Sequence, residues 1–313
     1  MPDSRQPSTT CVIPTYRSGD LLAQAIRSVQ EQSQPPDEII VVDDASPDDT
    51  YQIASDLAAS SCVPTRVLRL EKNSGGPCKP INHGIGAARG DLIFILEQDD
   101  LMPSSRIADQ LAVLRRYPDS ALVIGRFELI DGHQIEDVPK VYAQPQFLTL
   151  GDTVPSDAVL PIQVPSPQAF AGLLQHNFTI SNSNFCFPKS TWRQLGGFDE
   201  AIATVADLDF ALRAVVLGPL GISPTLTLRY RFNESSLNRR DLGLLRYEGL
   251  KVRMNAIRQK PAWGNEYFWT RWTPMRQQLI QALKHLRLKD SLRLLRFMFD
   301  TGSIKTRRVV RHS

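Results

Sequence analysis

Apolar residues in the first 130 positions form two alternating patterns: short continuous runs, and longer stretches with helical spacing. The runs predict buried strands at residues 11–16, 38–42, 65–70, 92–96 and 121–130. The stretches between them predict helices at residues 20–32, 50–59, 81–88 and 103–117. Asp20 is suited to cap the first of these helices. Strands that alternate with helices indicate βαβ units, so we expect an α/β fold with a mainly parallel sheet flanked by helices.

The pattern is less regular beyond position 130. Residues 131–175 have scattered prolines and little periodicity, which predicts a long loop. Two further strands are expected at residues 184–187 and 225–232, with a helix at 207–217 between them. From about residue 237 onward the chain is rich in Leu and Arg and is expected to be helical.

Charge divides the chain at nearly the same place. Residues 236–313 carry 18 Lys and Arg against five Asp and Glu, whereas residues 1–235 carry 18 against 28. We therefore predict a domain at 8–235 and a basic helical C-terminal extension at 236–313. Residues 276–311 mix Leu, Phe and Arg, so this part could lie on an anionic membrane surface or pack back on the acidic domain. No nucleic-acid partner is expected.

Four cysteines bear on the cell compartment. Cys11, Cys62, Cys78 and Cys186 contain no C-x-x-C pair, so neither a zinc site nor a disulfide framework is predicted. The polar N-terminus resembles no secretory signal, and no apolar run approaches the roughly 18–20 residues that span a bilayer. We expect a cytoplasmic protein that could lie at the inner face of the membrane.

Three carboxylates follow the apolar run at 92–96, within the sequence Glu97-Gln-Asp-Asp. Carboxylates this close repel one another unless water or a hard cation neutralises them. Mg²⁺ or Mn²⁺ prefers such oxygen ligands and would also neutralise a departing diphosphate. The other interpretation is an acidic surface turn before the next helix.

Two more polar clusters follow predicted strands. Asp43 and Asp44 come after 38–42 and could accept hydrogen bonds from a ribose or a base, or could simply form a turn. Residues 14–17 follow the first strand. Since ligands bind beyond the carboxyl ends of parallel strands, we expect all three clusters to converge. The Gly-rich loop at 73–79 could face an anion with help from Lys79, or could be an ordinary loop.

Asp207 begins the predicted helix at 207–217. A carboxylate at a helix N-terminus is favoured by the helix dipole, which would explain the residue without any function. The functional interpretation is a general base that deprotonates an acceptor hydroxyl.

Seven motifs occur together in a fixed order over about residues 10–235. They are Val12-Ile-Pro-Thr-Tyr, Asp37-Glu-Ile-Ile-Val-Val-Asp-Asp-Ala-Ser, Asn73-Ser-Gly-Gly, Asn82-His-Gly-Ile, Gly90-Asp-Leu-Ile-Phe-Ile-Leu-Glu-Gln-Asp-Asp, Gly196-Gly-Phe-Asp-Glu and Ala206-Asp-Leu-Asp. In this order and spacing the chain resembles the family-2 glycosyltransferases of the GT-A fold.

The resemblance implies a role for particular residues. Pro14 and Tyr16 would lie beside the nucleotide, and Asp44 would bind the uracil or other base. Asp99 would ligate a divalent metal, Mn²⁺ or Mg²⁺, with Glu97 on the metal or ribose side. Asp207 would be the catalytic base of an inverting displacement with an oxocarbenium-like transition state.

This resemblance also implies the partners: a nucleotide-sugar donor, UDP-sugar first, and a saccharide or lipid-linked acceptor of cell-surface polysaccharide synthesis. Two positions depart from the family pattern, since Glu97 stands where Asp is usual and Ala206 stands where Glu is common. Two alternatives remain at this point. One is a nucleotidyltransferase, although residues 11–17 lack a phosphate-binding loop, and the other is a non-catalytic nucleotide-sugar binder.

Overall fold

A computed structural model of the chain describes residues 6–130, 161–231, 242–260 and 262–263. Its strands are β1 (Thr9–Thr15), β2 (Glu38–Asp43), β3 (Thr65–Arg69), β4 (Leu92–Ile95), β5 (Leu122–Ile130), β6 (Ile162–Val164), β7 (Cys186–Pro188) and β8 (Leu220–Arg231). Its α-helices are α1 (Asp20–Gln30), α2 (Thr50–Ala59), α3 (Cys78–Ala87), α4 (Arg106–Arg116), α6 (Ser166–Gln175), α7 (Lys189–Leu195), α8 (Ala206–Leu217) and α10 (Leu242–Gln259). A 3₁₀ turn, η3, covers Asn182–Asn184.

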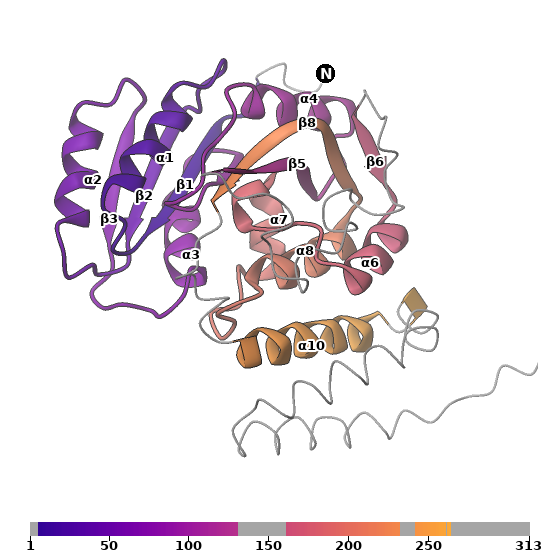
Figure 1. The fold of residues 1–313 in the computed structure, drawn as a ribbon. Coiled ribbons are helices and arrows are strands. Elements are labelled where there is room, and N and C mark those ends of the chain that lie inside the picture. Colours follow the sequence, from indigo (N-terminus) through magenta and orange to yellow (C-terminus); the bar gives the residue numbers. More distant parts are fainter. Residues whose placement is uncertain (1–5, 131–160, 232–241, 261, 264–313) are drawn as a thin grey trace, which may run out of the picture.

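The eight strands form one sheet in the order β3-β2-β1-β4-β7-β5-β8-β6 (Figure 1). Among the described residues four of the seven strand pairs are parallel: β1 with β2, β1 with β4, β2 with β3, and β5 with β8. The expected α/β fold with a mainly parallel sheet is therefore confirmed. The parallel group β3-β2-β1-β4 places the carboxyl ends of its strands at one edge.

Helices cover both faces of this sheet, which explains why the interior strands β1, β2 and β4 are mainly apolar and buried. In β1, Cys11 and Ile13 face a core formed with α1, α2 and α4, whereas Val12 faces a second core formed with α3, α6 and α8. The same alternation continues through β2 and β4. Because both faces are buried, neither face retains the polar residues that would mark a half-exposed strand.

Three local expectations are corrected. The side chain of Asp20 makes no capping hydrogen bond, because Gly19 occupies the cap and Asp20 is already the first helical residue. Residues 161–175 are not loop but include β6 and α6; α6 buries Ala169, Phe170, Leu173 and Leu174 on one helical face. Strand β8 begins at Leu220, because its first residues pair with both β5 and β6. The rest of the expected loop, 131–160, lies outside the described residues.

Helix α10 is the described part of the expected C-terminal extension, and it lies against α8 (Figure 1). Val252, Ala256 and Ile257 of α10 are buried in the core that contains α6 and α8. This segment therefore packs on the domain that precedes it. Residues 276–311 lie outside the described residues. Across the part that is described, none of the helices combines the length and apolar content needed to cross a membrane.

Candidate active site

The three polar clusters that follow β1, β2 and β4 lie together, as the parallel strands require. The backbone N–H of Asp44 donates to the carbonyl of Thr15, 2.8 Å away. The side-chain oxygen of Gln98 accepts from the backbone N–H of Tyr16 at 2.6 Å and from the hydroxyl of Thr15 at 2.7 Å. Gln98 thus ties the end of β4 to the end of β1, a role that the sequence alone did not assign to it.

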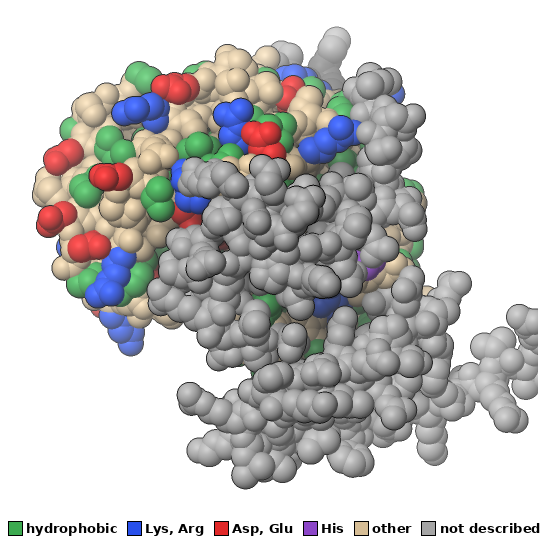
Figure 2. Space-filling view, in the orientation of Figure 1, with side chains coloured by type: hydrophobic (Ala, Val, Ile, Leu, Met, Phe, Trp, Pro, Cys, Tyr) green, Lys and Arg blue, Asp and Glu red, His purple; other side chains and the backbone are tan. Residues whose placement is uncertain are grey.

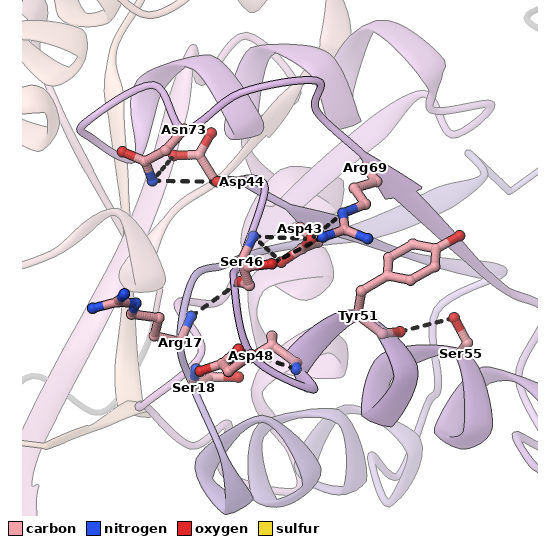
Figure 3. A network of polar contacts seen from close by, with 11 residues as sticks. Arg17, Ser18, Asp43, Asp44, Ser46, Asp48, Tyr51, Ser55, Arg69 and Asn73 are labelled. Carbon is pink, nitrogen blue, oxygen red and sulfur yellow. Dashed lines mark hydrogen bonds and ion pairs between the residues drawn. The ribbon is translucent and has the colours of Figure 1, made fainter.

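Asp43 and Asp44 have different surroundings (Figure 3). Asp43 is fully buried and pairs with the guanidinium of Arg69 at 3.1 Å, and it also accepts from the backbone N–H of Ser46. The Arg69 guanidinium in turn lies 5.0 Å from the centre of the Tyr51 ring. Asp43 therefore holds the turn after β2 together.

Asp44 lies beside the Gly-rich loop that precedes α3. Its carboxylate accepts from the Asn73 amide at 3.0 Å and from the Ser74 hydroxyl at 2.8 Å. Burial raises the pKa of Asp44, while the hydrogen bonds from Ser74 and the positive charge of Lys79 lower it. The charge of Lys79, on the first turn of α3, acts on Asp44, so both residues lie at the edge of the sheet where Pro14 and Tyr16 also lie. Pro14 is buried in β1, and Tyr16 is 36% exposed.

A carboxylate cluster, formed by Glu97, Asp99 and Asp100, follows β4 at this edge. One oxygen from each carboxylate lies within 4.8 Å of the others. Burial, followed by the charge of Asp99, raises the pKa of Glu97 to about 7. Burial and the neighbouring carboxylates also raise the pKa of Asp100 well above its usual range. Asp100 is part of the acidic cluster predicted from the sequence, although only Glu97 and Asp99 were expected as metal ligands.

Strand β8 holds this cluster from the opposite side. Leu101 and Arg229 exchange two backbone hydrogen bonds of 3.0 Å. The backbone N–H of Arg231 donates to Asp100 at 2.9 Å, and the Arg231 guanidinium donates to the carbonyl of Asp99 at 2.8 Å. The positive charge of Arg231 also lowers the pKa of Asp99, opposing the effect of burial. Asp99 and Asp100 are thus held in place by Arg231, which lies more than 100 positions away in the sequence.

Asp207 stands at the N-terminus of α8, close enough for its charge to raise the pKa of Glu97. Its side chain is buried and accepts from the Asn177 amide at 2.7 Å and the Thr179 hydroxyl at 3.0 Å. Burial raises the pKa of Asp207, and these two hydrogen bonds oppose that shift. A buried carboxylate with a raised pKa has the properties expected of a general base.

One short segment, Asn177 to Ser183, contacts both carboxylate groups. Beyond the bonds of Asn177 and Thr179 to Asp207, the amide of Asn182 donates to Glu97 at 3.0 Å. Ile180, between them, has φ of 64°, a left-handed conformation that a β-branched residue rarely adopts. The sequence pattern did not single out this segment, whose one signal was the run of Asn, Ser and Thr within Asn-Phe-Thr-Ile-Ser-Asn-Ser-Asn.

The donor set fits a divalent cation. Three carboxylates are hard oxygen ligands of the kind that Mg²⁺ and Mn²⁺ prefer. One oxygen of Asp100, Oδ2, is buried and has no hydrogen-bond partner. A cation would satisfy such an oxygen and would oppose the burial and the like-charge repulsion that raise the pKa values of Glu97 and Asp100. Glu97, Asp99 and Asp100 are therefore the residues that could hold a metal.

Fold and site together define a class. The chain aligns with the crystal structure of S. aureus TarS 1-349 in complex with UDP at a TM-score of 0.66, covering 92% of this chain and 78% of that chain. At 18% sequence identity this likeness shows the fold alone. A mainly parallel sheet with helices on both faces and an acidic cluster after β4 is the GT-A fold.

One family model and several curated proteins are similar to this chain in sequence. Residues 10–151 match the family model described as Glycosyl transferase family 2. The chain is 28% identical over 238 residues to the succinoglycan biosynthesis protein ExoO of Rhizobium meliloti, covering 74% of this chain and 63% of that protein. It is 31% identical over 115 residues to the poly(ribitol-phosphate) beta-N-acetylglucosaminyltransferase TarS of Staphylococcus aureus, covering 36% and 20%. Residues 10–151 of the chain are therefore similar to glycosyltransferase family 2, and the relatives named above are glycosyltransferases or polysaccharide biosynthesis proteins.

The chain spans only part of the length of the curated relatives that it matches. The chain spans 34% of an uncharacterized glycosyltransferase of Rickettsia felis, to which it is 25% identical over 235 residues, and 20% of TarS.

Proposed function

We propose that this chain transfers a sugar from a nucleotide-sugar donor to a hydroxyl acceptor, with inversion at the anomeric carbon and with help from a divalent metal. The observation that carries the proposal is the position of the buried carboxylate Asp207 next to the cluster of Glu97, Asp99 and Asp100. One group can serve as the base and the other can hold the cation that a diphosphate leaving group requires.

The donor would lie across the carboxyl ends of β1, β2 and β4. Pro14 and Tyr16 would lie beside the nucleotide, and Asp44 would accept a hydrogen bond from the base. Lys79, on the first turn of α3, would face the phosphates. Asp99 and Glu97, joined by Asp100, would hold Mn²⁺ or Mg²⁺.

Asp207 would act on the acceptor. Its carboxylate takes the proton of the acceptor hydroxyl as that oxygen attacks the anomeric carbon. The bond between this carbon and the diphosphate oxygen breaks on the opposite face, so the configuration inverts. Asn177 and Thr179 orient the carboxylate through their hydrogen bonds to Oδ2. A bound divalent ion supplies neutralisation of the charge that develops on the nucleoside diphosphate.

The donor and acceptor classes are proposed from the relatives. TarS has been crystallised with UDP and with UDP-GlcNAc, so UDP-sugars are tested first. ExoO is named for succinoglycan biosynthesis and TarS for a poly(ribitol-phosphate) acceptor. We therefore propose a saccharide or lipid-linked saccharide acceptor and a role in cell-surface polysaccharide synthesis.

The division into a catalytic domain at 8–235 and a basic extension at 236–313 is also a proposal. So is a peripheral position at the inner face of the membrane through the basic residues of that extension. Liposome sedimentation with anionic and with neutral vesicles tests it, and equal binding to both would refute the electrostatic contact.

The direct test is turnover of a panel of nucleotide sugars by the full chain, with Mn²⁺, Mg²⁺ or EDTA. We expect release of the nucleoside diphosphate from one UDP-sugar with metal and little release with EDTA. Release of pyrophosphate would indicate a nucleotidyltransferase. Binding of donors without release of nucleotide from any of them, with saccharide acceptors present, would indicate a non-catalytic binder.

The base is tested with Asp207→Asn, which keeps the shape of the side chain and removes the basic oxygen. We expect kcat to fall by about 10²- to 10⁴-fold, the usual contribution of a general base. Asp56→Asn is the matched control, because Asp56 is an exposed carboxylate on α2 that contacts Gln52. Full activity of Asp207→Asn would show that another group takes the proton.

A further inference from the structure

A loop of ten residues, 196–205, leads into α8 and so determines where Asp207 stands. Its first half is held by α3 and α8. Asn82 of α3 accepts from the backbone N–H of Phe198 at 2.8 Å and donates to its carbonyl at 2.9 Å. The Phe198 ring stacks on Phe210 of α8 with a centroid distance of 4.1 Å, and Arg213 donates to the carbonyl of Gly197.

The second half of the loop is held by α10, through one side chain. The carboxylate of Glu248 accepts from the backbone N–H of Ala203 at 3.1 Å, and from the backbone N–H and the hydroxyl of Thr204, both at 2.7 Å. Glu248 and Thr204 are each 5% exposed. A buried carboxylate with three donors is a strong anchor, because charged hydrogen bonds are stronger than neutral ones.

The start of α8 has no such support of its own. Its N-cap residue is Val205, whose side chain cannot accept a hydrogen bond. The N–H groups that precede the helix therefore find their acceptor on another element, 44 residues or more away in the sequence. If Glu248 is replaced, the buried N–H groups of Ala203 and Thr204 lose their hydrogen-bond acceptor, and we expect the end of the loop to move.

We propose that Glu248 is a positioning residue for the general base, and that α10 is therefore part of the catalytic apparatus. This inference rests on the proposed function of Asp207. Thr204 lies three residues before Asp207, so the anchor at Glu248 fixes the backbone from which Asp207 projects. Asn177 and Thr179 fix the carboxylate from the other side. A displacement at Thr204 would move the base away from the oxygen whose proton it takes.

The experiment compares steady-state kinetics of Glu248→Gln and Thr204→Val with those of the wild-type full chain, using the UDP-sugar that the wild type turns over. Glu248→Gln keeps the shape but turns an NH₂ group toward N–H donors. Thr204→Val removes only the hydroxyl bond and is the milder change. Gln259→Ala is the control, since Gln259 is an exposed residue of the same helix. Melting temperatures confirm that each variant is folded.

For Glu248→Gln we expect kcat to fall by about 10- to 100-fold, as misplacement of a catalytic group by about 1 Å can do. The KM for the donor should stay within about twofold, because Glu248 bonds to Ala203 and Thr204 and to none of the proposed donor-binding residues. Thr204→Val should show a smaller fall in kcat with the same unchanged KM.

Two outcomes refute the inference and can be told apart. Unchanged kcat in both variants, whatever their melting temperatures, would show that Glu248 supports only the fold. Equal changes in KM and kcat would show a general loosening of the domain. Absence of turnover by the wild type would refute the proposed function itself, and this role with it.

Discussion

The raised pKa of Glu97 predicts that metal binding depends steeply on pH near neutrality. A carboxylate must lose its proton to ligate a cation, so protons and metal compete for it. With a pKa of about 7, Glu97 is about one-tenth ionised at pH 6 and about nine-tenths ionised at pH 8. The apparent affinity for Mn²⁺ should therefore rise about tenfold between these pH values. The pKa values of Asp99 and Asp100 are also raised, so protons bound to these ligands would add to the pH dependence.

Isothermal titration of Mn²⁺ into the full chain at pH 6, 7 and 8 measures this effect. Glu97→Gln is the matched variant, because it removes the titrating group and keeps the side-chain length. Its affinity should be weaker at pH 8 and should change less between pH 6 and pH 8. A wild-type affinity that is independent of pH over this range would refute the assignment of Glu97 as a ligand with a raised pKa.

The same shift has a consequence for folding. Because the pKa of Glu97 is raised above its usual value of 4.5, the free energy of unfolding without metal falls as pH rises from about 4.5 to about 7. Mn²⁺ should therefore raise the melting temperature more at pH 8 than at pH 6, and a smaller rise at pH 8 would contradict this sign.

Four further predictions concern single residues. Gly90→Ala should lower the free energy of unfolding by about 1–3 kcal/mol, because its Cβ would lie 2.7 Å from the backbone nitrogen of Thr10. Gly86→Ala, with open space at its Cβ, should raise it by about 0.5–1 kcal/mol, and urea denaturation that gives both the same sign would refute this. Gln98→Ala should raise the KM for the nucleotide sugar by up to about 30-fold, the equivalent of about 1 kcal/mol for each of its hydrogen bonds to Thr15 and Tyr16, which hold the turn at Tyr16; unchanged KM in steady-state kinetics would contradict it. Asp44→Asn should weaken nucleotide binding, measured by titration with UDP, and equal affinity for UDP would show that Asp44 does not contact the base.

The N-terminal strands and helices could be predicted from the sequence because each has a hydrophobic pattern of its own. Strands β1, β2 and β4 are apolar runs buried on both faces, and each ends in a polar turn. Parallel pairing then brings the turns to one edge, which is why the convergence of Asp44 with the Glu97 cluster could be expected.

The rest depends on contacts that no local pattern contains. Strand β6 has three residues, too few to display a period, whereas β7 overlaps the strand predicted at residues 184–187. Asp100 is held by Arg231, 131 positions later, and the role of Glu248 depends on how α10 packs. The acidic cluster and Asp207 could be identified from the sequence as candidates. The hydrogen bonds that orient them arise only from tertiary structure.

On the surface drawn in Figure 2, the described acidic and basic side chains are interspersed over the part formed by the N-terminal strands and helices. The net acidic charge of residues 1–235 is therefore not gathered into one continuous patch on the visible described surface. An interaction of this surface with a basic partner would have to rely on shape as well as charge.

The left-handed backbone at Ile180 affects both the stability of the fold and the positions of Asp207 and Glu97. Such a conformation costs on the order of 1–3 kcal/mol, and it persists here between residues that bond to Asp207 and to Glu97. A glycine at this position would relax the strain and also free the segment to move. Under the proposed function, a glycine at this position would therefore give a more stable protein with a lower kcat.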